Sequence, residues 1–474
     1  MQHENWAGNL RYRAARVHRP ASVQEVCEIV KRAGRVKALG TRHSFNGIGD
    51  TEGDHISTAG LGRVIALDRE RRTVTVEGGI RYGDLCRYLN AEGFALPSLA
   101  SLPHISVAGA CATATHGSGD RCANLAASVC AVDIVTAEGE VRTFSRLPGG
   151  GRAGSAVRPG AGAPGSGVGS GASGNGFDGG TPGSGFDGDP GSDFGGGDFD
   201  GADFDGAVVN LGALGVVVAL TLELVPAFDM RQTVYRGLSL DRLEERFDEV
   251  FACGYSVSLF TTWRESVIEQ VWVKSRLDDG DAADSLLGGL GAQPARTKLH
   301  PIPGVPAENC TDQLGKIGPW HERLPHFRME FTPSAGDELQ SEYFVPRSRA
   351  MEALRAIDGI REHVAPVLHV SEVRSIARDS MWMSPCYGRD TISIHFTWKK
   401  EWEAVRAVLP LIEKVLAPFE PRPHWGKLFH MAPERVRALF PRLPDFRRLV
   451  QECDPHGKFR NPFLEAYVLG TGGD

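Results

Sequence analysis

The sequence lacks paired cysteines, any membrane-length apolar run and an excess of positive charge. Its nine cysteines contain no CxxC pair, so we expect reduced, mostly buried thiols rather than a disulfide framework or a metal site. A formal net charge of -7 argues against nucleic-acid binding as the main task. No apolar stretch reaches the length of a membrane span. We therefore expect no metal, nucleic acid or membrane among its partners.

A secretory signal is also missing, because residues 1–9 are polar and contain no apolar core. A cytoplasmic protein is the expectation, and a monomer is favoured. What the chain does have is length and an ordinary globular composition. Its 474 residues, 41% of them hydrophobic, are enough for two or three domains with sizeable cores.

The most informative stretch is the turn Gly40-Thr-Arg-His-Ser-Phe-Asn46, which follows a short apolar strand at Val36 to Leu39. Its glycine lets the backbone approach a ligand closely, and successive N–H groups can then point at phosphate oxygens. No apolar pattern surrounds His43. On these residues alone, it is either a solvated loop histidine or a functional one.

The first half of the chain predicts an α+β fold rather than a plain doubly wound sheet. Helical spacing follows the N-cap Ser22, and apolar strands and amphipathic segments alternate after it. The expected elements are helices at Val23 to Ala33 and Arg81 to Glu92, and strands at Val36 to Leu39, Val64 to Leu67, Thr73 to Glu77, Val129 to Thr136, Val141 to Phe144 and Val216 to Val225.

Two stretches of this half are unusual in composition. Ser101 to Gly119 consists almost wholly of small residues, which suits a backbone that lies against a large flat ligand. Gly149 to Gly206 is dominated by glycine with repeated Gly-Phe-Asp units, which predicts a disordered surface insert. Its Phe and Asp residues are either weak binding elements or parts of an inert loop.

After Pro226 the pattern changes to alternating strands separated by helices, which predicts an antiparallel sheet with helices on one face. This second domain is expected at 227–416, after a first domain at 1–226, and a C-terminal segment at 417–474 completes the site. The expected elements are strands at Ser256 to Phe260, Glu269 to Lys274, His326 to Phe331, Leu339 to Val345, Leu368 to Ile376 and Thr391 to Trp398, and helices at Leu240 to Ala252, Arg347 to His363 and Glu401 to Leu416.

Seven short motifs, in order, make the chain resemble the vanillyl-alcohol-oxidase superfamily of FAD enzymes, and within it the alditol oxidase branch. The resemblance covers nearly the whole chain except Gly149 to Gly206. The motifs are Gly40-Thr-Arg-His-Ser-Phe-Asn46, Ser101-Leu-Pro-His-Ile-Ser-Val-Ala-Gly109, Thr115-His-Gly-Ser-Gly119, Leu211-Gly-Ala-Leu-Gly215, Glu372-Val-Arg374, His395-Phe-Thr397 and His424-Trp-Gly-Lys427.

The resemblance implies a two-subdomain, PCMH-type FAD-binding domain covered by an antiparallel-sheet substrate cap. It implies that His43 carries a covalent bond to FAD, because a neutral imidazole nitrogen can act as a nucleophile. The residues expected to hold FAD are Gly40, Thr41, Arg42, His43, Ser44, Phe45, Asn46, Ser106, Cys111, Thr115, His116, Gly117, Ser118, Gly215 and Val216.

Oxidation of an alcohol by a flavin needs a group that takes the hydroxyl proton and groups that stabilise negative charge. Lys427, Arg374 and Glu372 are the catalytic candidates. Glu372 and Arg374 are two residues apart, so on a strand they share a face and offer an acceptor beside a donor to a polyol. The residues expected to bind substrate are Ser106, Glu372, Arg374, His395, Thr397 and Lys427.

Simpler interpretations stay open for each of these groups. Glu372 and Arg374 also fit a surface ion pair, and His395 with Thr397 fits a satisfied polar pair in a core. The favoured function is oxidation of alditols such as xylitol or sorbitol, with O₂ reduced to H₂O₂. The alternatives are an aldonolactone oxidase or dehydrogenase of the same superfamily, and an interaction protein that works through the glycine-rich insert.

Overall fold

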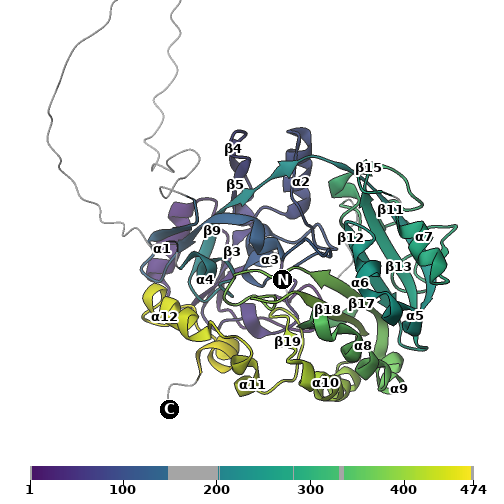
Figure 1. Ribbon diagram of the computed structural model, residues 1–474. Coiled ribbons are helices and arrows are strands. Elements are labelled where there is room, and N and C mark those ends of the chain that lie inside the picture. Colours follow the sequence, from purple (N-terminus) through teal and green to yellow (C-terminus); the bar gives the residue numbers. More distant parts are fainter. Residues whose placement is uncertain (1–2, 148–200, 202, 281, 330–335, 471–474) are drawn as a thin grey trace, which may run out of the picture.

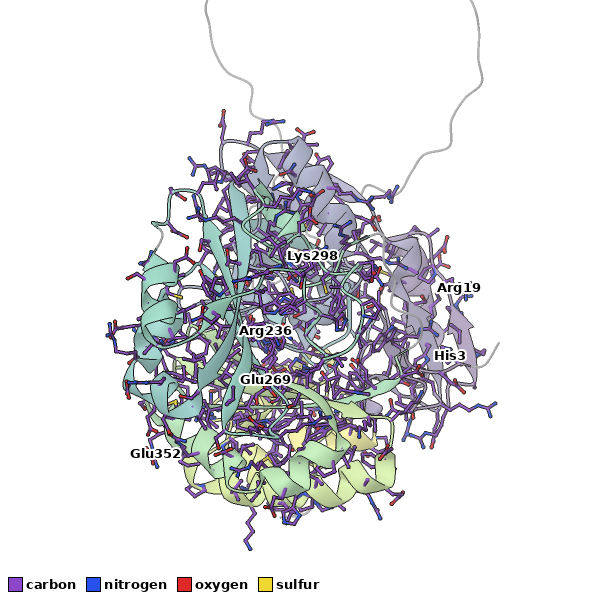
Figure 2. The ribbon with its side chains drawn as sticks, turned by 90° about the vertical axis from the view of Figure 1, so that its right-hand side faces the viewer. His3, Arg19, Arg236, Glu269, Lys298 and Glu352 are labelled. Carbon is purple, nitrogen blue, oxygen red and sulfur yellow. The ribbon has the colours of Figure 1, made fainter. Side chains whose placement is uncertain are left out.

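The computed structural model describes residues 3–147, 201, 203–280, 282–329 and 336–470. Two parts lie side by side in Figure 1: an N-terminal part built on two small sheets, and a second part built on one large sheet. The chain leaves the first part at Pro226 and enters the large sheet at Asp229. Figure 2 shows the two parts from another side, with His3 and Arg19 marking the first part, and Arg236, Glu269 and Glu352 the second.

The first small sheet is parallel, in the order β1-β3-β2, and helix α1 adjoins it in the chain. The predicted helix is confirmed, because the Glu25 N–H donates to the Ser22 hydroxyl at 3.2 Å and caps the first turn. Its apolar residues Val26 and Val30 are buried. The elements are β1 Arg16–His18, α1 Val23–Arg32, β2 Val36–Leu39 and β3 Asp54–Ser57.

The second small sheet is antiparallel, in the order β4-β5-β9-β7-β8, and the two predicted strands that form β7 and β8 pair as a hairpin. Three short helices and a two-residue strand pair, β6 with β10, complete this part. The elements are β4 Val64–Asp68, β5 Thr73–Glu77, α2 Tyr82–Ala91, β6 Phe94–Ala95, α3 Val107–Ala112, β7 Val129–Val135, β8 Val141–Ser145, α4 Phe204–Val208, β9 Val216–Glu223 and β10 Val225–Pro226.

The glycine-rich insert ends earlier than predicted. Phe204 and Gly206 lie in α4 and are buried, so the last residues of the predicted range Gly149 to Gly206 belong to the core. A Cβ on Gly206 would lie 2.3 Å from the Trp382 ring, so this backbone packs directly on an aromatic side chain. Most of the predicted insert lies outside the described residues.

The large sheet is antiparallel, in the order β14-β11-β13-β12-β17-β18-β16-β19, with β15 paired to β11. Helices α5, α6, α8 and α10 contact its strands β11, β12, β16 and β18. The strands are β11 Asp229–Ser239, β12 Ser256–Thr261, β13 Val267–Arg276, β14 Gln293–Pro294, β15 Gly318–Pro319, β16 Glu338–Pro346, β17 Leu368–Ile376, β18 Thr391–Lys399 and β19 Arg422–Pro423.

Two predicted helices of this part are broken. Arg246 leaves the helical conformation at φ -139° and splits the first into α5 Leu240–Glu245 and α6 Phe247–Ala252. The second predicted helix begins with a 3₁₀ turn at Arg347–Arg349, and Gly359 and Ile360 divide the rest into α8 and α9. The remaining helices are α7 Ala282–Gly289, α8 Ala350–Asp358, α9 Arg361–Val364, α10 Trp402–Leu416, α11 Pro433–Ala438, α12 Leu443–Cys453 and α13 Pro462–Leu464.

The strand predicted at His326 to Phe331 is wrong over its described residues. The N–H groups of His326 and Phe327 both donate to the Ser101 carbonyl, and that of Arg328 donates to Asn309. The backbone groups are therefore satisfied by neighbouring loops rather than by a strand ladder. The rest of that prediction lies outside the described residues.

The C-terminal segment joins the two parts (Figure 1). Strand β19 pairs with β16 at the edge of the large sheet, and α12 then returns to the N-terminal part beside α4. The Val36 N–H donates to the Lys458 carbonyl at 2.8 Å. Among the described residues, no helix combines the length and the apolar character that crossing a membrane requires.

The contribution of the C-terminal segment to stability can be measured at Asn461. Its buried amide donates to the carbonyls of Gly47, Ile48 and Asp50 at 2.9 to 3.1 Å. Asn461→Ala leaves these carbonyls without their donor, and we expect a loss of about 2 kcal/mol or more in the free energy of unfolding. Denaturant unfolding measures it. The exposed Gln24→Ala is the control, and equal stability of both variants would contradict the assignment.

Candidate functional site

A cavity of about 470 Å³ opens between the two parts. One wall is the turn at 40–45 together with the small-residue stretch at 100–116. The opposite wall is one face of the large sheet, and the turn that ends at Lys427 closes the space between them. Each wall comes from a different part of the chain, so the cavity exists only in the folded protein.

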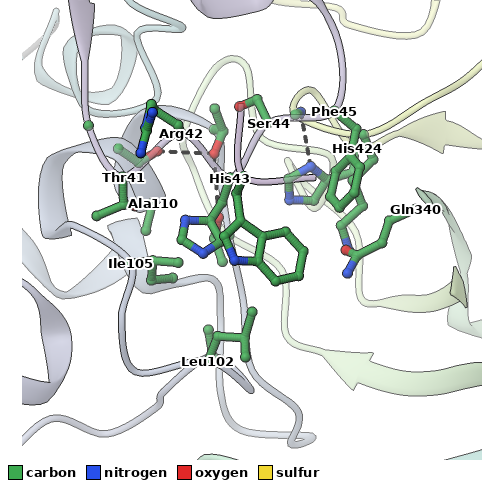
Figure 3. A pocket seen from close by; sticks show the side chains of 18 of the residues that line it. Thr41, Arg42, His43, Ser44, Phe45, Leu102, Ile105, Ala110, Gln340 and His424 are labelled. Carbon is green, nitrogen blue, oxygen red and sulfur yellow. Dashed lines mark hydrogen bonds between the residues drawn. The ribbon is translucent and has the colours of Figure 1, made fainter. Parts of the chain in front are cut away.

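The turn around His43 is held from outside by the N-terminal segment. The Trp6 ring stacks on the His43 imidazole, with centroids 5.2 Å apart, and the Trp6 N–H donates to the Arg42 carbonyl at 2.8 Å. Arg42 has a φ of 65°. The backbone N–H groups of Arg42, His43 and Ser44 donate to no described residue, which leaves them available to a ligand. Figure 3 shows the side chains of this turn around His43.

The His43 imidazole is neutral and chemically available. Burial lowers its pKa to about 4, so the ring carries no charge at neutral pH. Its Nδ1 atom is buried and has no hydrogen-bond partner among the described residues. A buried nitrogen without a partner is costly in an empty site, and it fits a bond to a ligand.

The small-residue wall brings a hydroxyl next to this turn. Ser106 stands at the N-terminus of α3, and its buried Oγ has no partner among the described residues. A Cβ on Gly40 would lie 2.5 Å from that oxygen, and one on Gly109 would lie 2.9 Å from it. Glycine at both positions therefore leaves the Ser106 hydroxyl free to face the cavity.

On the sheet wall, strand register places polar residues in one row. Phe260 of β12 lies opposite Glu372 of β17, Glu372 lies opposite His395 of β18, and His395 lies opposite Glu342 of β16. Paired residues of neighbouring strands point to the same face. Arg374 and Thr397, two residues further along their strands, face the same side and also line the cavity.

Glu342 is the centre of a buried charge network. It accepts from Arg374 Nη2 at 2.6 Å through Oε1, and from Lys427 Nζ at 2.7 Å through Oε2. Its side chain is fully buried. Burial alone would raise its pKa, but Lys427 and Arg374 hold that pKa well below the usual value. Burial in turn lowers the pKa of Lys427, partly offset by Glu342.

Lys427 also determines which ring nitrogen of the neighbouring His395 carries the proton. Its Nζ lies 2.7 Å from His395 Nδ1, and His395 Nε2 lies 3.1 Å from Thr397 Oγ1. A lysine ammonium is only a donor, so it places the acceptor nitrogen at Nδ1 and the proton at Nε2. Burial lowers the pKa of His395 to about 4, which keeps the ring neutral.

The structure gathers every predicted substrate-binding and catalytic residue on this cavity, and ten of the predicted cofactor residues line it too. Five do not. Asn46 instead donates to the carbonyls of Trp425 and Lys427, at 2.9 and 2.7 Å, and ties the two turns together. The other four, whose side chains or Cβ positions meet protein atoms elsewhere, are Cys111, Gly117, Ser118 and Val216.

Sequence reasoning missed Glu342, Gln340, His326 and Trp6, which all line the cavity. Gln340 and Glu342 are two residues apart on a strand that was predicted, so the shared face of a strand was the available signal. His326 was placed on a strand that does not form. Trp6 carried no signal, because its role depends on a contact 37 positions along the chain.

Comparison with known proteins identifies the family. Residues 14–145 match the family described as FAD binding domain, and residues 337–467 match D-arabinono-1,4-lactone oxidase. An alditol oxidase from a Streptomyces species is 47% identical over 98% of this chain and 99% of that protein. This chain belongs to the alditol oxidase family. It is therefore an FAD-dependent oxidoreductase.

More distant relatives act on lactones. An L-gulono-1,4-lactone dehydrogenase from Mycobacterium tuberculosis is 28% identical, and an L-gulonolactone oxidase from Mus musculus is 24% identical, each over 98% of both chains. Cholesterol oxidase from B. sterolicum shares the fold, with a TM-score of 0.69 at 11% identity over 98% of this chain and 96% of that one. The α+β architecture with a PCMH-type FAD-binding part is thus confirmed.

The cavity fits FAD on its own chemistry. The free N–H groups of the His43 turn suit phosphate or ring oxygens, and the small-residue wall leaves room for a flat ring. Gly212 and Gly215 also line the cavity, with φ of 64° and 148°. A Cβ on Gly215 would lie 2.2 Å from the Val135 carbonyl oxygen, so only glycine fits there.

Glu342→Gln tests the charge network. The amide keeps the shape but removes the negative charge that raises the pKa of Lys427, so we expect that pKa to fall. The pH profile of anaerobic flavin reduction should shift downward by the same amount.

The control for this prediction is Glu413→Gln. Glu413 is also a buried carboxylate, but it accepts from Tyr343 on the opposite side of β16. An unshifted profile in Glu342→Gln, or an equal shift in both variants, would contradict the assignment.

Proposed function

We propose that the protein oxidises the primary alcohol of alditols such as xylitol and sorbitol to the aldose, with reduction of O₂ to H₂O₂. The observation that carries this proposal is the buried row of alternating acceptors and donors on the sheet wall: Glu372, His395 and Glu342, with Arg374 and Lys427 beside them. A chain of hydroxyls both donates and accepts, so it matches such a row. The 47% identity to an alditol oxidase supports the same substrate class.

The protein residues position the alcohol and manage its proton. Bound FAD supplies the acceptor for the hydride that leaves the carbon. Arg374 and Lys427 hydrogen-bond the reacting hydroxyl and stabilise negative charge on its oxygen. Lys427, whose pKa burial lowers, takes the hydroxyl proton in its neutral amine form, which still donates an N–H to His395 Nδ1.

The substrate's other hydroxyls find partners of both kinds. Glu372 is an ionised acceptor, since Arg374 and His326 hold its pKa below the usual value against the opposing effect of burial. Ser106 and Thr397 each offer a hydroxyl that donates or accepts. The site thereby offers a hydrogen-bond partner to each hydroxyl along a polar ligand.

His43 is proposed to carry the covalent bond to FAD through Nδ1. A neutral ring at neutral pH and a buried nitrogen without a partner are the two features such a bond needs. The Trp6 stack keeps the imidazole in one orientation. A covalent link would hold the cofactor in place throughout turnover.

Lactone oxidation is the second candidate, supported by the lactone-acting relatives and by the family match at 337–467. A scaffold function through the glycine-rich insert has no support, because the insert lies largely outside the described residues and the family is enzymatic. A cytoplasmic location and a monomeric state stay predictions.

Anaerobic reduction separates the two candidates. Mixed with xylitol or sorbitol, the purified protein should lose its flavin absorbance within seconds, and exposure to air should then produce H₂O₂. L-gulono-1,4-lactone at the same concentration serves as the comparison. Faster bleaching by the lactone than by every alditol tried would overturn the proposal.

His43→Ala tests the covalent link. The variant should release its flavin on acid precipitation, whereas the wild-type flavin should stay with the pellet, because only the imidazole supplies the bond. His456→Ala, an exposed histidine, is the control and should keep the colour. A coloured acid pellet from His43→Ala would place the link elsewhere.

A further inference from the structure

A second lysine–histidine pair lies behind Glu372, and the mechanism above uses only the effect of His326 on the charge of Glu372. Lys274 of β13 and His326 are both buried, with 1% and 5% of their surfaces exposed. Lys274 Nζ lies 3.0 Å from His326 Nδ1, and His326 Nε2 lies 2.8 Å from Glu372 Oε1. The three side chains therefore form one line from the interior to the cavity wall.

This line has one consistent arrangement of protons. Lys274 Nζ also donates to the carbonyls of Leu324 and Pro325, so its position is fixed by the backbone. Burial lowers the pKa of Lys274 to about 7. In its ammonium form Lys274 only donates, and the ionised Glu372 only accepts, so His326 Nδ1 is the acceptor and the His326 proton sits on Nε2. That N–H points at Glu372 Oε1. Lys274 thus selects the histidine tautomer that donates to the carboxylate.

Packing and hydrogen bonds hold the His326 ring in this orientation. The edges of Phe260 and Trp272 pack against it, with centroids 5.6 and 5.2 Å away, and both ring nitrogens are engaged. His326 therefore has no nitrogen left for a substrate, although it lines the cavity. Any effect it has on the reaction must pass through Glu372.

Glu372 is left with one oxygen for a ligand. Its Oε1 receives His326 Nε2–H and lies 3.6 Å from Arg374 Nε, whereas Oε2 receives no hydrogen bond from any described residue. A carboxylate fixed through one oxygen presents the other in a defined direction. Without the histidine, the side chain would be free to rotate toward Arg374.

We propose that Lys274 and His326 are positioning residues that hold Glu372 so that Oε2 accepts a hydroxyl of the polyol. The inference rests on the proposed function, since it assigns the alditol as the ligand of Glu372. It adds two residues to the site that make no contact with substrate through a polar atom. Their task is to fix the direction of an acceptor in a site that must recognise hydroxyls by their geometry.

A pair of His326 variants tests the proposal in the full-length, FAD-loaded protein with xylitol as substrate. In His326→Gln the side-chain oxygen accepts from Lys274 and the amide donates to Glu372, so KM should stay within about threefold of wild type. In His326→Leu the donor is lost, and KM should rise about tenfold or more, as expected for a hydrogen bond to a charged group. The exposed His363→Leu is the control.

A double-mutant cycle shows whether the effect passes through Glu372. In the Glu372→Gln background, adding His326→Leu should change KM by less than about threefold, because the group it orients is already altered. If His326→Leu does not fold, Lys274→Met is the alternative variant. It should raise KM when Glu372 is present but not in the Glu372→Gln background. Flavin content and the melting temperature report any general damage.

Several results would overturn the inference. The first is an unchanged KM in both His326→Leu and Lys274→Met. The second is an equal rise of KM in His326→Gln and His326→Leu. The third is an equal effect of His326→Leu on KM with Glu372 and in the Glu372→Gln background. Failure of the proposed function looks different, because the wild-type flavin itself would then not be reduced by xylitol. The inference fails only in comparisons among variants of a protein that does turn over.

Discussion

The buried carboxylate of Glu342 is the constraint on which the site depends. A fully buried charge is tolerated only when partners neutralise it and fill its hydrogen bonds. Arg374 from the neighbouring part of the sheet and Lys427 from the C-terminal turn meet this need at 2.6 and 2.7 Å. One side chain thereby joins the sheet to a turn 85 positions further along the chain. The closed cavity is a consequence of satisfying that charge.

Two lysines act on two histidines in the same way. Lys427 faces His395 Nδ1, and Lys274 faces His326 Nδ1, so both rings present an N–H from Nε2. Each ring is kept neutral mainly by burial. These two N–H groups donate to Thr397 and to Glu372. The fixed tautomers therefore hold the polar side chains that line the cavity in one orientation.

Local sequence patterns were sufficient to predict most of the helices and strands. The boundaries of β2, β5 and β17 follow from short apolar or alternating runs, and α1 follows from its cap and its spacing. The predicted residues Glu372, Arg374, His395 and Thr397 share a face because the period of a strand is two. Prediction failed at His326, whose N–H donates to the Ser101 carbonyl and whose carbonyl accepts from the Thr311 N–H, since nothing in a local window reveals such distant partners. Prediction of one continuous helix also failed at Arg246, because tertiary packing overrides helical periodicity.

The family, the turn around His43 and the alternation of polar residues on the strands can be read from the amino-acid sequence. These are properties of neighbouring residues and of short motifs. Which polar groups meet depends on the fold, because strand register and the returning loops bring together residues such as Lys274 and His326, 52 positions apart. The fold also decides that Glu342 is the centre of the network, since the charge of a carboxylate is visible in a sequence but its burial and its partners are not.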